Sequence, residues 1–245
     1  MAGHDTRLGS RRTATRLVSL ARMTFRGFTN DAFDFYARLE ADNSKAFWLA
    51  NKAIFEQHVK APMAALLAEL PEQYQPFSVF RPNRDVRFSK DKSPYKTHIG
   101  AYSEHEGGAG YYLQLSATGL VVAGGYYQMA TDQLPRFRDA IDDDKTGSAL
   151  AAVVTKLHKG GYTTGAFEEL KTAPRGYPKD HPRIELLRGK GLFGSRTFEP
   201  AAWMGKPALK AKVLGVWTAI EPMCDWLDAN VGPSEQPPDD ERWVN

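Results

Sequence analysis

The spacing of the apolar residues changes twice along the chain, and this change restricts the fold more than any other feature of the sequence. Before residue 71 and after residue 131, apolar side chains recur every three to four positions, as they do on the buried face of a helix. Between Phe77 and Tyr127 they recur at every second position, as on the buried face of a strand. Helices, then strands, then helices predict a single α+β domain with a central antiparallel sheet rather than a wound βαβ fold.

Capping and turn residues divide these regions into elements. The expected helices cover residues 30–41, 43–59, 62–70, 131–141, 148–159 and 206–227. Four or five antiparallel strands are expected, including residues 85–89, a strand from Tyr95, residues 111–116 and residues 120–123 after a turn at 117–119. Residues 170–193 follow neither period and are expected to be irregular.

Composition sets the ends of the folded part. Residues 1–22 contain five arginines against the single acid Asp5, so we predict a disordered basic extension, with a transit peptide or a working start at Met23 as the alternatives. Residues 23–232 are predicted to form the α+β domain, because 42% of the chain is hydrophobic and this suffices for a core. Residues 233–245 are predicted to be a disordered tail.

The environment of the protein is indicated by what the sequence omits. Its apolar runs stay far below the roughly 20 residues that a membrane-spanning helix needs, so no membrane partner is expected. Cys224 is the only cysteine, which excludes an intrachain disulfide and a cysteine-based metal cluster. We therefore expect a cytoplasmic protein, and the sequence leaves its oligomeric state open.

Residues 81–98, RPNRDVRFSKDKSPYKTH, hold a local excess of positive charge. Two aspartates, Asp85 and Asp91, stand against six cationic side chains, which are Arg81, Arg84, Arg87, Lys90, Lys92 and Lys96. The whole chain carries only +3, and residues 1–22 are also basic, so the remainder is net acidic. If a strand, a turn at residues 90–94 and a second strand form here, the cations converge on one patch.

Converging cations repel one another unless carboxylates or a bound anion offset them, and arginine matches phosphate geometry well. We therefore predict a binding site for a phosphate-bearing small molecule or a nucleotide. Its expected members are Arg81, Arg84, Arg87, Ser89, Lys90, Lys92, Lys96 and, as a second wall, Tyr126. The alternative is structural, in which arginines and neighbouring aspartates form ion pairs and the lysines cover a solvated turn.

Catalysis is weakly indicated. His98 follows Lys96 by two residues, so it would share a strand face with the patch and act as a base, and Asp85 is a second weak candidate. Adjacent residues such as Glu104 and His105 cannot face one ion from a strand, so no metal site is predicted. The common nucleotide, dehydrogenase, esterase and zinc protease motifs are absent from the sequence, and it indicates no cofactor. Whether the protein is an enzyme stays open.

Two other classes of function remain in competition. The same patch is suited to a nucleic-acid backbone, with Tyr95, Tyr102 and Tyr126 available to stack on bases. The net acidic remainder of the domain argues against a long polyanion. A protein interaction module that meets an acidic partner is the third possibility.

Four segments of the chain point to a known family. They are RDVRFSKDKSPYKTHIGAY, LEADNSKAFWLANKAIFEQHV, VAGGYYQM and PRGYPKDHPRIELLRGKGLF. Together they resemble a widespread family of hypothetical proteins known only as a domain of unknown function, with a run of the type RDxRFSxDKxPYK as its signature. The chain departs from it at Phe47-Trp48, where the reverse order is expected. The resemblance implies a single α+β domain over about residues 25–232 and no established activity.

Overall fold

The computed structural model describes residues 24–87, 90–104 and 108–236. Its helices are α1 (Asn30–Ala41), α2 (Lys45–Ile54), α3 (Ala61–Ala68), α4 (Gln133–Asp142), α5 (Asp144–Lys159), α6 (Ile184–Arg188) and α7 (Leu209–Asn230). Its strands are β1 (Ser78–Val79), β2 (His98–Glu104), β3 (Gly110–Ser116), β4 (Gly119–Tyr126), β5 (Thr163–Gly165) and β6 (Leu192–Phe198). The predicted α+β class is confirmed. The predicted basic extension and the last nine residues of the tail lie outside the described residues.

The strands form one sheet in the order β1-β2-β3-β4-β6-β5, and every neighbouring pair is antiparallel. The described sheet has six strands, whereas four or five were expected. The predicted turn between β3 and β4 is confirmed, and Gly119 adopts a φ of 121° there. A Cβ at Gly119 would overlap the carbonyl oxygen of Phe198, so the turn needs glycine.

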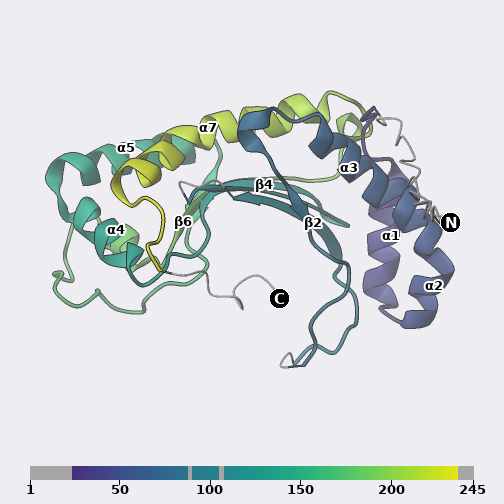
Figure 1. Cartoon of the computed structure of the whole chain (residues 1–245), viewed down its shortest axis with the longest axis horizontal. Coiled ribbons are helices and arrows are strands. Elements are labelled where there is room, and N and C mark those ends of the chain that lie inside the picture. The colour runs from purple at the N-terminus through teal and green to yellow at the C-terminus, as the bar shows by residue number, and fades with distance from the viewer. Residues whose placement is uncertain (1–23, 88–89, 105–107, 237–245) are drawn as a thin grey trace, which may run out of the picture.

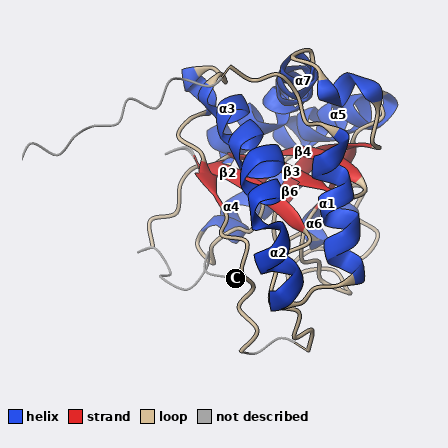
Figure 2. Ribbon diagram, turned by 90° about the vertical axis from the view of Figure 1, so that its right-hand side faces the viewer, coloured by secondary structure: helices blue, strands red, loops and turns tan. Residues whose placement is uncertain are grey.

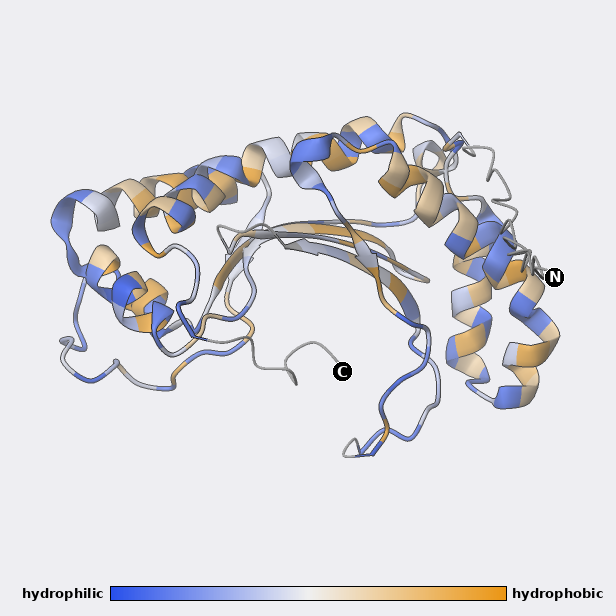
Figure 3. Ribbon diagram, viewed as in Figure 1, coloured by the Kyte–Doolittle hydropathy of each residue, from blue (hydrophilic) through white to orange (hydrophobic). Residues whose placement is uncertain are grey.

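The helices that the structure describes cover one face of this sheet. The helix α7 lies across it, with α5 beside α7 (Figures 1 and 2). Trp217 of α7 is fully buried, and its indole nitrogen donates to the carbonyl of Ala123 on β4 at 3.0 Å. Apolar residues recur along the strands and along α7 (Figure 3). No described helix lies across the middle of the opposite face, as an antiparallel sheet permits.

The first three predicted helices are present, but the second and third are continuous. The helix α2 passes into a π-helix (Phe55–Lys60) and then into α3, and Pro62 lies in the first turn of α3. A proline clashes with the carbonyl four residues earlier, here that of His58, and a π turn is wider than an α turn. The chain therefore accommodates Pro62 without a break.

The expectation that residues 170–193 are irregular was partly wrong, because they contain α6 and the start of β6. On β6, Gly194 occupies a position on the core face, where a Cβ would lie 3.2 Å from Cγ1 of Ile220. A glycine at that place interrupts the alternation of apolar residues that identifies a strand. The strand β6 was not predicted because α7 packs so closely against position 194 that only glycine fits there.

The predicted strand over residues 85–89 is also wrong where the structure describes it, because residues 85–87 belong to no strand. Residues 81–87 and 90–97, called the arm below, form the two sides of an irregular hairpin that projects from the sheet (Figure 1), and Phe88 and Ser89 lie outside the described residues. Its base is closed by the bonds from Arg84 N to Pro94 O at 2.9 Å and from Lys96 N to Pro82 O at 2.7 Å. The Asp85 carboxylate accepts from Arg87 N at 3.1 Å, and such local bonds compete with a strand ladder.

Candidate functional site

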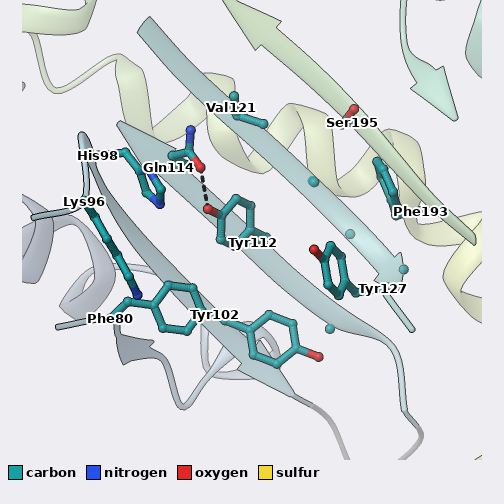
Figure 4. Close-up of a pocket in the computed structure, with 14 residues that line it drawn as sticks. Phe80, Lys96, His98, Tyr102, Tyr112, Gln114, Val121, Tyr127, Phe193 and Ser195 are labelled. Atoms are coloured by element: carbon teal, nitrogen blue, oxygen red, sulfur yellow. Dashed lines mark hydrogen bonds between the residues drawn. The ribbon is translucent and has the colours of Figure 1, made fainter. Parts of the chain in front are cut away.

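The uncovered face of the sheet holds a hollow of about 480 Å³ (Figure 4). Side chains on β2, β3, β4 and β6 that alternate with the core residues point into it. The hollow is lined by Phe80, Lys96, His98, Tyr102, Gly110, Tyr112, Gln114, Val121, Ala123, Gly124, Gly125, Tyr127, Phe193 and Ser195. Most of these residues are aromatic or small, and the charged members come from the base of the arm.

Strand register explains why this face is hollow. Ala123 on β4 lies between Tyr112 on β3 and Ser195 on β6, and Gly125 lies between Gly110 and Phe193. Small residues therefore occupy the central strand while larger side chains rise from its neighbours. This arrangement leaves a depression above β4.

Two glycines allow aromatic rings to lie across the strands. A Cβ at Gly110 would overlap the hydroxyl of Tyr102. At Gly100 it would lie 3.0 Å from the Phe80 ring and 3.0 Å from the Tyr112 hydroxyl. The rings use the space that a side chain on either glycine would fill, so the shape of the hollow depends on both positions.

The polar groups of the hollow include a fixed carboxamide. The Tyr112 hydroxyl donates to Oε1 of Gln114 at 2.6 Å (Figure 4). Burial, with a contribution from Tyr127, raises the pKa of Tyr112 to about 12, so the hydroxyl keeps its proton at neutral pH. Because Oε1 accepts this bond, the amide nitrogen of Gln114 is the group left to donate to a ligand.

Lys96 and His98 lie together at one end of the hollow, and Lys96 is the cation of this end. Nζ of Lys96 lies 5.1 Å from the centre of the Phe80 ring. Burial lowers the pKa of Lys96, and the positive charges of Arg81 and Arg84 lower it further. Burial also lowers the pKa of His98, followed by the charges of Lys96 and Arg84. In the described part of the chain Lys96 forms no ion pair with a carboxylate, so positive potential accumulates at this end.

Further out on the arm, cations meet acids. Arg84 pairs with Asp91, and Arg87 pairs with Asp85 through Nη2 and Oδ2 at 2.6 Å. Hydrogen bonds from Arg87 lower the pKa of Asp85 to about 2, which keeps that carboxylate ionised. These contacts match the structural alternative for the outer arm.

The two lysines of the arm tip lie apart from the hollow. Lys92 donates from Nζ to the carbonyl of Val86 at 2.8 Å, and Lys90 is exposed. The predicted convergence of all six cations on one strand face is therefore corrected. A hairpin with local side-chain bonds spreads them along its length, and Lys96 alone of the six lines the hollow.

The weak catalytic pair is not brought together. Asp85 is bound to Arg87 on the arm, and His98 begins β2 inside the hollow. No hydrogen bond joins Asp85 to His98 within the described residues. The lowered pKa leaves His98 neutral at pH 7, with one ring nitrogen able to accept a proton.

Two of the tyrosines proposed for stacking face the core. Tyr95 stacks on Trp48 with ring centroids 4.3 Å apart and ring planes at 10°. Tyr126 is buried on the helix-covered side, where its hydroxyl donates to Asp228 at 2.9 Å. The structure thus places Tyr126 away from the proposed second wall, while Tyr102 does line the hollow.

Most of the aromatic lining of the hollow was not predicted from the sequence. Alternation on β3 did separate Tyr112 and Gln114 from the core residues, but nothing indicated that their face holds a hollow. Phe80, Tyr127 and Phe193 lie at or beyond strand ends, where alternation carries no signal. These residues meet only through the pairing of β2, β3, β4 and β6.

Neither a metal centre nor a membrane span is found in the part of the chain that the structure describes. No three residues of the His, Cys, Asp and Glu types lie close enough there to hold an ion. No described helix combines the length and the apolar character needed to cross a bilayer.

The fold and the hollow define an α+β protein whose open antiparallel sheet presents a ligand-sized site on its uncovered face. The chain belongs to the conserved hypothetical protein family DUF2461, which matches residues 31–226. This confirms the resemblance to a family of hypothetical proteins. No curated protein and no solved structure matches the chain.

Proposed function

We propose that the protein binds a phosphate-bearing small molecule, such as a nucleotide, in the hollow, with the phosphate at Lys96. The observation that carries this proposal is the position of Lys96, which lines the hollow, lies 5.1 Å from the centre of the Phe80 ring and forms no ion pair with a carboxylate in the described part of the chain. Burial, followed by the nearby positive charges of Arg81 and Arg84, also lowers the pKa of Lys96. A dianionic group at Nζ would relieve this repulsion. A cation in a partly enclosed, aromatic site also interacts more strongly with an anion than one in open water.

Magnitudes are compatible with a useful affinity. A hydrogen bond to a charged group is worth about 1.5–3 kcal/mol, and Lys96 would supply one such bond to the phosphate. The hollow, at about 480 Å³, lies within the usual size range of small-ligand sites. The apolar lining provides the additional contact surface that micromolar binding requires.

A binding screen with matched ligands tests the proposal. Phosphorylated metabolites and their dephosphorylated counterparts are compared by thermal shift, and positive compounds are measured by calorimetry. Lys96→Met should weaken binding at least tenfold, since one charge-assisted bond is lost, whereas Lys96→Arg should retain most of it. Lys159→Met, a change at the end of α5, is the control and should have no effect. Equal binding of both members of each pair would refute the proposal.

Nucleic-acid binding is the competing function. Of the three tyrosines suited to stacking, two are buried, which leaves Tyr102 with the hollow's other aromatic residues. Salt distinguishes the two functions, because the logarithm of the affinity for nucleic acid falls with a slope of about −0.7 to −0.9 per phosphate neutralised. A mononucleotide in the hollow should show a slope no steeper than about −2.

A protein partner with an acidic surface remains a third proposal, and Arg87 and Lys90 of the exposed arm would meet it. Capture from a nuclease-treated lysate, repeated with Arg87→Ala, tests this function. We further propose a cytoplasmic location, which the single buried cysteine, Cys224, favours. Fractionation of cells with an antibody to the protein tests that location.

A further inference from the structure

The end of the hollow opposite Lys96 is formed by aromatic rings. Tyr127 contacts Phe193, with ring centroids 6.4 Å apart, and Phe167, with centroids 4.8 Å apart. Tyr127 is 40% exposed and Phe167 64% exposed. Grouped aromatic rings that keep this much surface in water are typical of a binding surface rather than of a core.

The floor beneath these rings has almost no side chains. Ala123, Gly124 and Gly125 follow one another on β4, and Tyr112 rises beside them from β3 (Figure 4). A flat group that stands on this floor between Tyr112 and Tyr127 would have backbone at its edge and could stack on the tyrosine rings. The geometry therefore favours a planar ligand over a bulky or branched one.

Polar partners are few at this aromatic end. Ser195 supplies a hydroxyl, and Oε1 of Gln114 already accepts a bond from Tyr112. A sugar with three or four hydroxyl groups would leave several of them without partners, and each loss costs about 1–3 kcal/mol. A heteroaromatic ring carries no polar group on its faces, so stacking leaves its polar edge groups outside the apolar contact.

The length of the hollow also excludes the shortest ligands. Lys96 precedes β2 and Phe193 lies on β6, so three strand spacings of about 4.8 Å separate the two ends, about 14 Å in total. Inorganic phosphate or a small sugar phosphate reaches only one end. A ring joined to a phosphate through a pentose approaches both.

Resting on the function proposed above, we infer that the ligand is a nucleotide. Its base lies over residues 123–125 between Tyr112 and Tyr127, and its phosphate lies at Lys96. Tyr112 and Tyr127 are then the residues that select the ring, and Lys96 is the residue that selects the phosphate. The two contributions are separable because they come from different ends of the hollow.

The test uses the purified full chain and three classes of compound: the common nucleoside 5′-monophosphates, ribose 5-phosphate and the corresponding nucleosides. In the wild type, the best nucleotide should bind at least tenfold more tightly than ribose 5-phosphate, since stacking on an aromatic side chain typically contributes this much or more per base. Tyr127→Ala and Tyr112→Leu should reduce this ratio toward one and leave ribose 5-phosphate binding unchanged. Tyr162→Leu, which alters a tyrosine outside the hollow, should keep the ratio.

Lys96→Met separates the inference from the proposed function. It should weaken nucleotide and ribose 5-phosphate alike, so the ratio between them persists. If every nucleotide binds no better than ribose 5-phosphate, the inference is wrong and the phosphate site stands. If the nucleosides bind as tightly as the nucleotides, the ring site stands and the phosphate proposal fails. If no compound of the three classes binds, both are overturned.

Discussion

Asn43 holds the backbone of Tyr95 through two hydrogen bonds across 52 positions of sequence. Its Oδ1 accepts from Tyr95 N at 3.0 Å, and its Nδ2 donates to Tyr95 O at 3.0 Å. The Tyr95 ring is stacked on Trp48 of α2 in addition. Tyr95 is therefore attached to the N-terminal helices. This attachment fixes the backbone next to Lys96, which lines the hollow.

Asn43→Ala should loosen the base of the arm. Two half-buried hydrogen bonds are lost, so we expect the free energy of unfolding to fall by about 1–3 kcal/mol and the affinity for phosphate ligands to fall severalfold. Chemical denaturation and calorimetry measure the two effects. Ser44→Ala is the matched control: it removes the cap at Phe47 N, and should cost about 1 kcal/mol of stability without weakening the ligand.

His98 should make the ligand-free protein less stable below neutral pH. Its pKa in the folded state lies below the ordinary 6.5, chiefly because the ring is buried and then because Lys96 and Arg84 lie nearby. As the pH falls through about 6.5, the unfolded chain binds a proton at this histidine before the folded chain does, so the free energy of unfolding decreases.

Urea denaturation of the wild type and of His98→Gln, from about pH 7.5 to about pH 5.5, measures this effect. The variant should lose less stability over this interval, and Lys96→Met should have an intermediate dependence because only one neighbouring charge is removed. His158→Gln, at the exposed end of α5, serves as the control. The same loss of stability in His98→Gln as in the wild type would contradict the prediction.

Asp85 should titrate far below an ordinary aspartate. Bonds from Arg87 lower its pKa to about 2, so any stability from this pair is present above about pH 3.8 and is lost as the pH falls from there through about 2. Carboxyl chemical shifts from nuclear magnetic resonance report this pKa directly. In Arg87→Ala it should move upward toward 3.8, while nucleotide affinity changes little because Arg87 lies outside the hollow. An unshifted Asp85 in the variant would show that the pair does not form in solution.

Gly110→Ala should alter ligand binding more than stability. The added Cβ would overlap the Tyr102 hydroxyl, which is the far end of a side chain that can rotate away. We expect the melting temperature to change by only a few degrees, while the affinity for phosphorylated ligands changes severalfold because the Tyr102 ring must leave its place. Gly161→Ala is a useful comparison, since its Cβ meets no atom but its φ of 76° strains any other residue. It should lower stability and leave the ligand in place.

Local pattern was sufficient for the long helices and for the centre of the sheet, while the short helix α6 was missed. The start of α2 and the alternation on β3 both depend on near neighbours, and both were predicted, with Ser44 as the cap that the structure shows. The strand β6 was missed because Ile220 of α7 fills the space that a side chain at Gly194 would occupy. This contact joins segments distant in sequence, so no local pattern indicates it. Residues 85–89 of the arm were predicted as a strand because their apolar residues alternate, whereas the Asp85 carboxylate accepts a local bond from Arg87 N that competes with a strand ladder.

The candidate site divides in the same way. Lys96 and His98 were recognised by charge and spacing, and both line the hollow. Asn43 gave no signal because its partner, Tyr95, lies on another element. Arg84 and Arg87 were expected to face a ligand, yet each forms an ion pair with a nearby aspartate. The sequence alone does not distinguish an arginine in such a pair from one that is available to a ligand.

Alternate residues of the strand β3 face the core and the hollow. Tyr111, Leu113 and Leu115 are committed to the interior, whereas Tyr112 and Gln114 are not. On the function proposed above, substitutions at Tyr112 and Gln114 should change which ligand binds and leave the core side of the sheet intact. A library randomised at these two positions alone would therefore test new ligand specificities on an unchanged fold.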